Sequence, residues 1–201
     1  MQDEHDHVHA DHEGHNHEHH HHQVSYLDAV EQYRADKDEF FRTANGSPIP
    51  ATERDAFTGL PYYPVDESLR FEDLQLEPYA GNEPVRFEIP TSDGRTRPAQ
   101  RAGVFHLPLE GAPRQLTAYI FEGGDTENVF VPFQDSTSGN DTYGAGRYLD
   151  IEREDDGTYT VDFNLAYHPS CVYDARFSCP LTPPENRLPV AIHGGERLAP
   201  A

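Results

Sequence analysis

Hydrophobic residues recur at helical spacing between Ser25 and Arg42, directly after 22 residues that are almost entirely polar. The apolar positions are Leu27, Val30, Tyr33, Phe40 and Phe41, with the Lys37 stem between them. Ser25 followed by Asp28 is a capping-box pattern, and the Gly and Pro residues from Gly46 to Pro50 end the periodicity. The pattern predicts one amphipathic helix over about residues 25–42, whose apolar stripe must pack on the rest of the protein.

After Leu69 the pattern changes to short segments in which hydrophobic and polar residues alternate, as in β-strands. These segments cover residues 69–76, 85–89, 99–109, 116–121, 129–133, 147–152 and 159–163. Thr91-Ser92-Asp93-Gly94 and Asp155-Asp156-Gly157 are hairpin-turn sequences between neighbouring segments. Together with 17 Pro and 15 Gly, this spacing predicts a mainly β fold, an antiparallel sheet curled into a barrel or a sandwich.

Residues 23–201 are numerous enough to form a single domain with its own core. We expect it to contain the helix, the strands between about residues 69 and 163, and a Pro-rich C-terminal segment over residues 168–201. After Met1, the first 22 residues have only Val8 and Ala10 as apolar side chains. Such a segment cannot bury enough surface to offset the entropy of ordering, which predicts a disordered tail over residues 1–22.

The formal net charge of −21 is carried by the tail and the domain alike. The tail holds six of the 36 acidic residues and none of the 15 basic ones, which leaves the domain with 30 acidic and 15 basic residues. Lys37 is the only lysine. High acidity with almost no lysine indicates adaptation to molar salt, where a Debye length of about 3 Å screens self-repulsion. An acidic protein of an ordinary high-GC bacterium is the alternative.

The acidic composition argues against nucleic acid and anionic membrane surfaces as partners, because both attract clustered Lys and Arg. No apolar run approaches the roughly 18 residues of a membrane-spanning helix. The N-terminus lacks the basic and apolar regions of a secretion signal, so we expect a cytoplasmic location. Tyr143 to Gly146 lacks the third Gly of a dinucleotide fingerprint, and no nucleotide cofactor is expected.

The tail carries the strongest chemical signal in the chain. Its histidines are His5, His7, His9, His12, His15, His17, His19, His20, His21 and His22, interleaved with the six acidic residues. Imidazole is the commonest protein ligand for divalent transition metals, and carboxylates add oxygen ligands. The tail therefore predicts a metal-binding segment, with Zn or Ni as the preferred ion. An expression tag is the alternative, although tags are normally unbroken His blocks.

Polar and aromatic residues gather on or beside the later strands. They are Asp135, Thr137, Tyr143, Arg147, Tyr148, Asp162, Asn164 and Tyr167. In one interpretation they are structural: Arg147 pairs with Asp135 or Asp162, while Asp162 and Asn164 cap backbone amides in turns. In the other they line a pocket in which Arg147 binds a small anionic ligand, with tyrosine walls.

His168, Cys171 and Cys179, with His193 further on, match a tetrahedral zinc set by residue type but not by spacing. The two cysteines could instead form a disulfide or remain as buried free thiols. The sequence leaves all three possibilities open.

Residues 130–197 closely resemble the DUF1684 family of bacterial and archaeal proteins. The residues that carry the resemblance are Phe133, Asp135, Thr137-Ser138-Gly139, Thr142-Tyr143, Gly146-Arg147-Tyr148-Leu149, Asp162-Phe163-Asn164, Ala166-Tyr167, Pro169, Cys171, Cys179-Pro180, Pro183-Pro184 and Glu185-Asn186-Arg187-Leu188. Phe57, Gly59-Leu60 and Ser92-Asp93-Gly94 also fit, so the resemblance covers about residues 26–198. It implies a compact single domain without implying an activity. The tail lies outside it, and His168 stands where the family pattern has Asn.

These observations favour a protein that stores or hands on Zn, Ni or Co through its tail. One alternative is a small-molecule-binding domain or enzyme with its site around Asp135, Arg147, Asp162 and Asn164. Another is a structural or interaction module. The sequence decides neither the oligomeric state nor whether the protein is an enzyme.

Overall fold

A computed structural model describes residues 24–199, so the predicted disordered tail lies outside the described residues. The helices and strands are α1 (Tyr26–Thr43), η1 (Arg54–Ala56), η2 (Glu67–Leu69), β1 (Arg70–Leu74), β2 (Arg86–Pro90), β3 (Thr96–Leu109), β4 (Ala112–Phe121), β5 (Asn128–Phe133), β6 (Arg147–Glu152), β7 (Tyr159–Asp162), η3 (Phe163–Leu165), η4 (Ser170–Val172) and η5 (Pro184–Asn186). The mainly β fold with one N-terminal α-helix is as predicted from the sequence.

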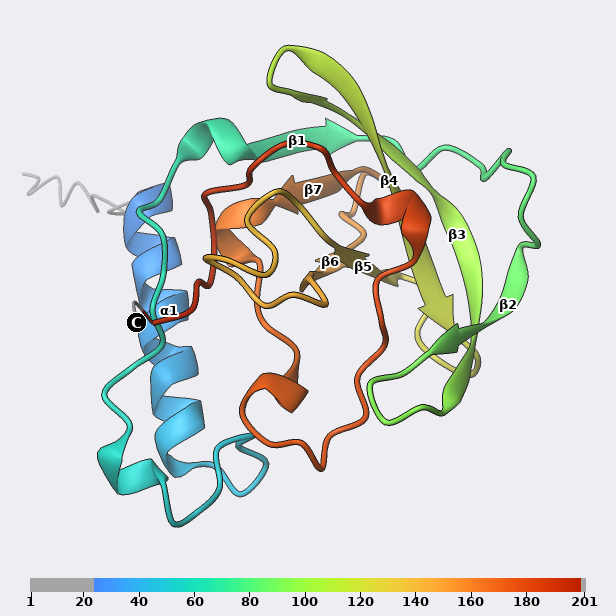
Figure 1. Cartoon of the computed structure of the whole chain (residues 1–201). Coiled ribbons are helices and arrows are strands. Elements are labelled where there is room, and N and C mark those ends of the chain that lie inside the picture. The colour runs from blue at the N-terminus through green and yellow to red at the C-terminus, as the bar shows by residue number, and fades with distance from the viewer. Residues whose placement is uncertain (1–23, 200–201) are drawn as a thin grey trace, which may run out of the picture.

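The strands form two antiparallel sheets (Figure 1). The larger sheet has the order β2-β3-β4-β5-β6, and the smaller sheet pairs β1 with β7. Between β4 and β5 the ladder is reduced to the single pair Tyr119–Phe130, so these two strands diverge along most of their length. Over residues 24–199 the sheets pack as a sandwich and do not close, which confirms the sandwich form of the prediction.

Strand β3 shows how alternation builds the core. Phe105, Leu107 and Leu109 are at most 3% exposed, whereas His106 between them points away from the core. Successive side chains of a strand face opposite sides, so one face of β3 packs into the sandwich. Each large apolar side chain buried in this way contributes about 2 kcal/mol relative to an exposed position.

Helix α1 begins as the capping pattern predicts, because the Ser25 hydroxyl accepts a hydrogen bond from the Asp28 amide at 3.1 Å. Val30 and Phe41 are the buried residues of its apolar stripe. The ring of Phe41 packs edge-on against Tyr173, with 5.1 Å between centroids. The helix thus lies on the C-terminal part of the domain through these two residues. The expectation that the whole apolar stripe is buried is wrong, because Leu27, Tyr33 and Phe40 are 46%, 41% and 47% exposed.

The C-terminal segment after η5, red in Figure 1, runs across the molecule and returns to α1. Its backbone bonds to distant loops: the Ser136 amide donates to the Val190 carbonyl at 2.9 Å, and the Tyr63 amide donates to the Gly195 carbonyl at 2.9 Å. A segment with almost no regular secondary structure therefore joins the helix to the sheets.

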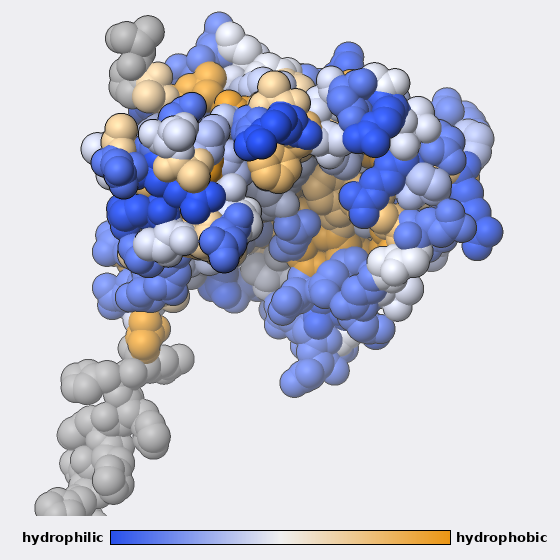
Figure 2. Space-filling model, turned by 90° about the horizontal axis from the view of Figure 1, so that it is seen from below, coloured by the Kyte–Doolittle hydropathy of each residue, from blue (hydrophilic) through white to orange (hydrophobic). Residues whose placement is uncertain are grey.

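The surface is largely hydrophilic, and Figure 2 shows a hollow, seen from below, in which hydrophobic residues are exposed. Phe87, Phe121 and Tyr167 are partly buried and pack against a hydrophobic cluster formed by Tyr119, Phe130, Tyr148 and Cys179. Within residues 24–199, no helix combines the length and the apolar character needed to cross a bilayer.

Candidate functional site

Arg147, at the start of β6, is 1% exposed and holds the C-terminal segment in place. Its Nη2 donates to the Asp135 carboxylate at 3.1 Å and to the Ile192 carbonyl at 2.8 Å. Its Nη1 donates to the Glu196 carbonyl at 3.0 Å and also to the Gly194 carbonyl. Burial lowers the pKa of Arg147, and the Asp135 carboxylate opposes that shift. The guanidinium is thus fully enclosed by protein groups.

The carboxylate of Asp135 organises the turn that follows β5. Its Oδ1 accepts hydrogen bonds from the Thr137 hydroxyl at 2.6 Å and from the Thr137 amide at 3.2 Å. Its Oδ2 accepts from the Ile192 amide at 2.8 Å, and the Thr137 and Thr142 hydroxyls lie 2.9 Å apart. Asp135, Thr137 and Arg147 therefore form one buried network, which corresponds to the structural interpretation of these residues.

Asp162 and Asn164 belong to a different network, on the side of the domain where α1 begins. Asp162 caps η3 by accepting from the Asn164 amide at 2.9 Å, and it accepts from the Tyr26 hydroxyl at 2.7 Å. The Asn164 side chain accepts from the Asp66 amide at 2.8 Å and donates to the Asp66 carbonyl at 2.8 Å. Arg147 pairs with Asp135 and not with Asp162, so the structure does not gather the predicted polar residues into one site.

Tyr148 and Tyr167 were predicted to line a pocket around Arg147, but their hydroxyl groups hydrogen-bond to other parts of the domain. The Tyr148 hydroxyl donates to the Pro180 carbonyl, and the Tyr167 hydroxyl donates to the Asp150 carboxylate at 2.5 Å. The two rings pack edge to face at 5.7 Å. Burial raises the pKa of both phenols, so both stay protonated donors at neutral pH.

His168 is 4% exposed and accepts a hydrogen bond at Nε2 from the Tyr143 amide at 3.2 Å. Burial lowers its pKa to about 3, with smaller contributions from the charges of Arg147 and Lys37. The imidazole is therefore neutral, and the nitrogen that could bind a metal already accepts a protein hydrogen bond.

The zinc set, one of the three possibilities that the sequence left open, is not assembled among the described residues. The Cys171 amide donates to the Cys179 sulfur at 3.3 Å, but the His193 ring packs against Tyr63 instead, at 5.3 Å. Within residues 24–199, no group of three or more His, Cys, Asp or Glu side chains is arranged to hold a metal ion. Cys171 and Cys179 are both free thiols in the structure. Cys171 and Cys179 pack beside each other in one hydrophobic cluster, whereas His168 and His193 contact other groups, which spacing along an irregular segment did not reveal.

The single lysine takes part in a buried ion pair that the sequence did not predict. Lys37 Nζ lies 2.6 Å from Glu196 Oε1 and 4.5 Å from the centroid of the Tyr167 ring. Glu196 is 1% exposed, and its Oε2 accepts from the His168 amide at 2.7 Å and from the Tyr173 hydroxyl at 3.0 Å. The ion pair fixes α1 to the C-terminal segment. In the sequence, the only indication that Lys37 is buried is its helical spacing relative to Val30 and Phe41.

A second unpredicted ion pair lies on the larger sheet. Arg101 is 6% exposed and donates to Glu185 Oε1 from Nε at 2.8 Å, and its Nη2 lies 2.6 Å from the same oxygen. The Tyr119 hydroxyl donates to that oxygen at 3.0 Å, while the guanidinium lies 4.1 Å from the centroid of the Phe87 ring. Glu185 is among the residues that carry the family resemblance, but nothing local in the sequence shows that η5 lies over β3 and β4.

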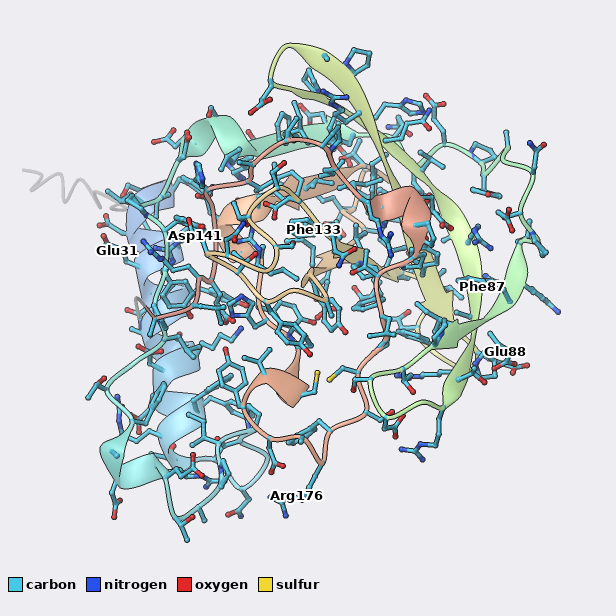
Figure 3. All side chains as sticks on the ribbon, viewed as in Figure 1. Glu31, Phe87, Glu88, Phe133, Asp141 and Arg176 are labelled. Atoms are coloured by element: carbon cyan, nitrogen blue, oxygen red, sulfur yellow. The ribbon has the colours of Figure 1, made fainter. Side chains whose placement is uncertain are left out.

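Two of the cavities in the described part of the chain adjoin β2, β3 and β4. One, of about 560 Å³, is lined by Arg86, Phe87, Glu88, Pro98, Ala99, Gln100, Ile120, Phe121, Glu122, Gly123, Gly124 and Thr126. The other, of about 470 Å³, is lined by Glu77, Pro78, Tyr79, Ala80, Gly81, Val104, His106, Gln115, Thr117 and Glu185. Figure 3 places Phe87 and Glu88 of the first cavity on β2 at the edge of the molecule, and Phe133 at its centre.

The ten histidines of the predicted metal-binding tail, His5 to His22, lie outside the described residues. Within the described domain, the cavities are the candidate ligand-binding sites. Metal binding by the tail is still a prediction.

The family model described as a protein of unknown function, DUF1684, matches residues 55–197. A similar solved structure is the solution structure of an uncharacterized protein from Haloarcula marismortui. It is 37% identical, the alignment covers 85% of this chain and 92% of that chain, and the TM-score is 0.63. No curated protein matches the chain. From the family match and this similarity, we conclude that the chain belongs to the DUF1684 family.

Proposed function

We propose that the protein binds divalent transition-metal ions through residues 1–22, with Zn or Ni preferred. The observation that carries the proposal is the presence of ten histidines and six carboxylates, without any Lys or Arg, in that segment. Neutral imidazoles supply the metal-binding lone pairs, and the carboxylates add oxygen ligands and attractive charge.

The arrangement of the histidines favours a high-capacity and comparatively weak store. His5, His7 and His9 alternate with other residues, whereas His19 to His22 are consecutive. A segment with ligands in excess can supply several imidazoles to one ion and hold more than one ion at a time. Protons compete for the same lone pairs, so metal affinity falls as the pH drops through about 6.5.

The tail would supply the ligands by itself. Among residues 24–199, no group of three or more potential ligand side chains is arranged around a common point. His168, the most buried histidine of the domain, already accepts a hydrogen bond from the Tyr143 amide. Removing the tail should consequently remove nearly all metal binding.

Calorimetry with Zn and Ni on the full chain and on residues 23–201 tests the proposal. We expect at least one bound ion per full chain and none above background for the shortened protein. A second variant, with the ten tail histidines replaced by Asn, keeps the length and the carboxylates and should also lose binding. Equal stoichiometry for the full and shortened proteins would contradict the proposal.

We also infer that the protein works at high salt. Its net charge of −21 and single lysine support this inference, and so does its similarity to a protein from Haloarcula marismortui. The melting temperature should rise between 0.1 and 2 M KCl, roughly as the Debye length falls below 10 Å. A melting temperature independent of salt would contradict it.

A further inference from the structure

The cavity of about 470 Å³ lies on the face of β3 and β4 opposite the hydrophobic core. Val104 lies opposite Thr117 and His106 opposite Gln115 in the register of these strands, so two cross-strand pairs form its floor. The segment from Glu77 to Gly81 forms one wall, and Glu185 of η5 forms another. Segments that are far apart in the sequence thus enclose one space.

Glu185 presents its carboxylate to this cavity in a fixed orientation. All the hydrogen bonds recorded for this carboxylate among the described residues go to Oε1, from Arg101 Nε at 2.8 Å and from the Tyr119 hydroxyl at 3.0 Å. Arg101 is held in turn by the Pro84 carbonyl at 2.5 Å and by the Phe87 ring. The second carboxylate oxygen, Oε2, is left to accept a hydrogen bond from a ligand.

The opposite wall is also built by specific packing. A Cβ at Gly81 would lie 2.3 Å from the Tyr79 hydroxyl oxygen, so the phenol lies directly across this glycine. A Cβ at Gly103 would lie 2.5 Å from the Glu77 carbonyl oxygen, so glycine is needed where this loop contacts β3. Two backbone hydrogen bonds between Glu77 and Val104, at 2.8 and 3.1 Å, fix the loop on the strand. The cavity is thus formed before any ligand arrives, as is usual for binding sites.

The charge of the lining selects the kind of ligand. Glu77 and Glu185 are acidic, none of the lining residues is Lys or Arg, and the Nε2 of His106 lies 3.3 Å from the Glu77 carboxylate. Arg101, behind Glu185, compensates one of these two charges, which leaves the site with an excess of about one negative charge. The Tyr79 ring, whose centroid lies 5.3 Å from the Arg101 guanidinium carbon, is the aromatic side chain of the lining, and Gln115 and Thr117 offer neutral acceptors.

We propose that this cavity binds a small organic cation, with an ammonium or guanidinium group that donates to Glu185 Oε2 and lies against the Tyr79 ring. The apolar body of the ligand would rest on Val104 and Pro78. The inference concerns the folded domain and is independent of metal binding by the tail.

An NMR titration of the full-length, isotope-labelled protein with benzylamine, protonated at pH 7, tests the proposal. Benzyl alcohol is the neutral probe of nearly the same shape, and benzoate is the anionic one. We expect saturable shifts of the amide signals of Val104, His106 and Gln115 with benzylamine alone. Equal shifts with benzyl alcohol, or none at these residues up to solubility, would overturn it.

Two variants test whether benzylamine binding depends on the negative charge of the cavity. Glu185→Gln removes the anchoring charge and should weaken benzylamine binding about tenfold, a loss of roughly 1.4 kcal/mol. Because this change also disturbs Arg101, Gln115→Lys is the second variant: it places a cation at an exposed position of the floor and should weaken binding by a similar factor. Gln32→Lys, the same substitution on exposed α1, should leave binding unchanged. Unaltered binding by Gln115→Lys would contradict the proposal whatever Glu185→Gln does.

Discussion

The side-chain amide of Asn186 hydrogen-bonds to both backbone polar groups of Thr117. Asn186 Oδ1 accepts from the Thr117 amide at 2.8 Å, and Nδ2 donates to the Thr117 carbonyl at 2.8 Å. Nδ2 also donates to the Pro132 carbonyl at 2.8 Å. Thr117 lies in β4 and Pro132 in β5, where the two strands have diverged. One side chain of η5 therefore replaces the missing ladder bonds between them.

Replacing Asn186 by Ala should lower the free energy of unfolding by about 3 kcal/mol. The residue is fully buried, and the change leaves one backbone N–H and two carbonyls of the sheet without partners. Urea denaturation measures the loss, with Asn45→Ala in an exposed turn as the control. A loss no larger than that of the control would contradict the bridging role of Asn186.

Lys37→Met should destabilise the protein by about 3 kcal/mol, because it leaves the Glu196 carboxylate buried without its cation. Arg42→Met is the matched control on the same helix. Its partner Glu39 is 62% exposed, so that loss should be within about 1 kcal/mol. Thermal or urea unfolding of both variants gives the comparison. Adding Glu196→Gln to Lys37→Met should recover part of the stability, and no recovery would show that the ion pair is not the cause.

Stability should fall as the pH drops from about 6.5 toward 3, because His168 is buried in its neutral form. The unfolded chain protonates this imidazole below about pH 6.5, whereas in the folded protein its pKa is about 3. The contribution is fully present above pH 6.5 and is lost on acidification, by up to about 1.4 kcal/mol per pH unit.

Urea unfolding at pH 6.5 and pH 5 measures this dependence. His168→Asn should flatten it, since Asn can still accept from the Tyr143 amide but does not titrate. His106→Asn is the control, because that side chain is 43% exposed. If the free energy of unfolding of His168→Asn depended on pH as strongly as that of the unmodified protein, groups other than His168 would be responsible and the prediction would be wrong.

The two cysteines should differ in reactivity toward iodoacetamide under native conditions. Cys179 is 7% exposed, and burial raises the pKa of its thiol to about 11. Cys171 is only half-buried, so it should be alkylated first. Peptide mass spectrometry without reductant reads out both sites. An intact mass two hydrogens short would instead show a disulfide and contradict the free thiols.

The sequence predicted those parts of the fold that depend on local periodicity. The helix lies at 26–43 against a predicted 25–42, and the alternation around Phe105 identified β3. The tight turn at Glu110-Gly111 was missed, together with the first residues of β4. Pro108 lies opposite Pro113 at that end of the ladder, and prolines normally argue against paired strands.

The polar residues could be recognised by type but not by partner. The pairing of Arg147 with Asp135 was one of two options, and only the three-dimensional arrangement decided between Asp135 and Asp162. Glu185 and Glu196 lie in irregular segments without periodicity, so their partners on β3 and α1 could not be inferred from spacing.

The contacts of the C-terminal segment set the order in which the domain can be completed. Asn186 is needed between β4 and β5, Ile192 and Gly194 enclose the guanidinium at the start of β6, and Glu196 binds Lys37 of α1. In the sequence these groups follow β1 to β7, whereas α1 precedes all of these strands. During synthesis, α1 must therefore wait until β1 to β7 have all been made before it gains its ion-pair partner.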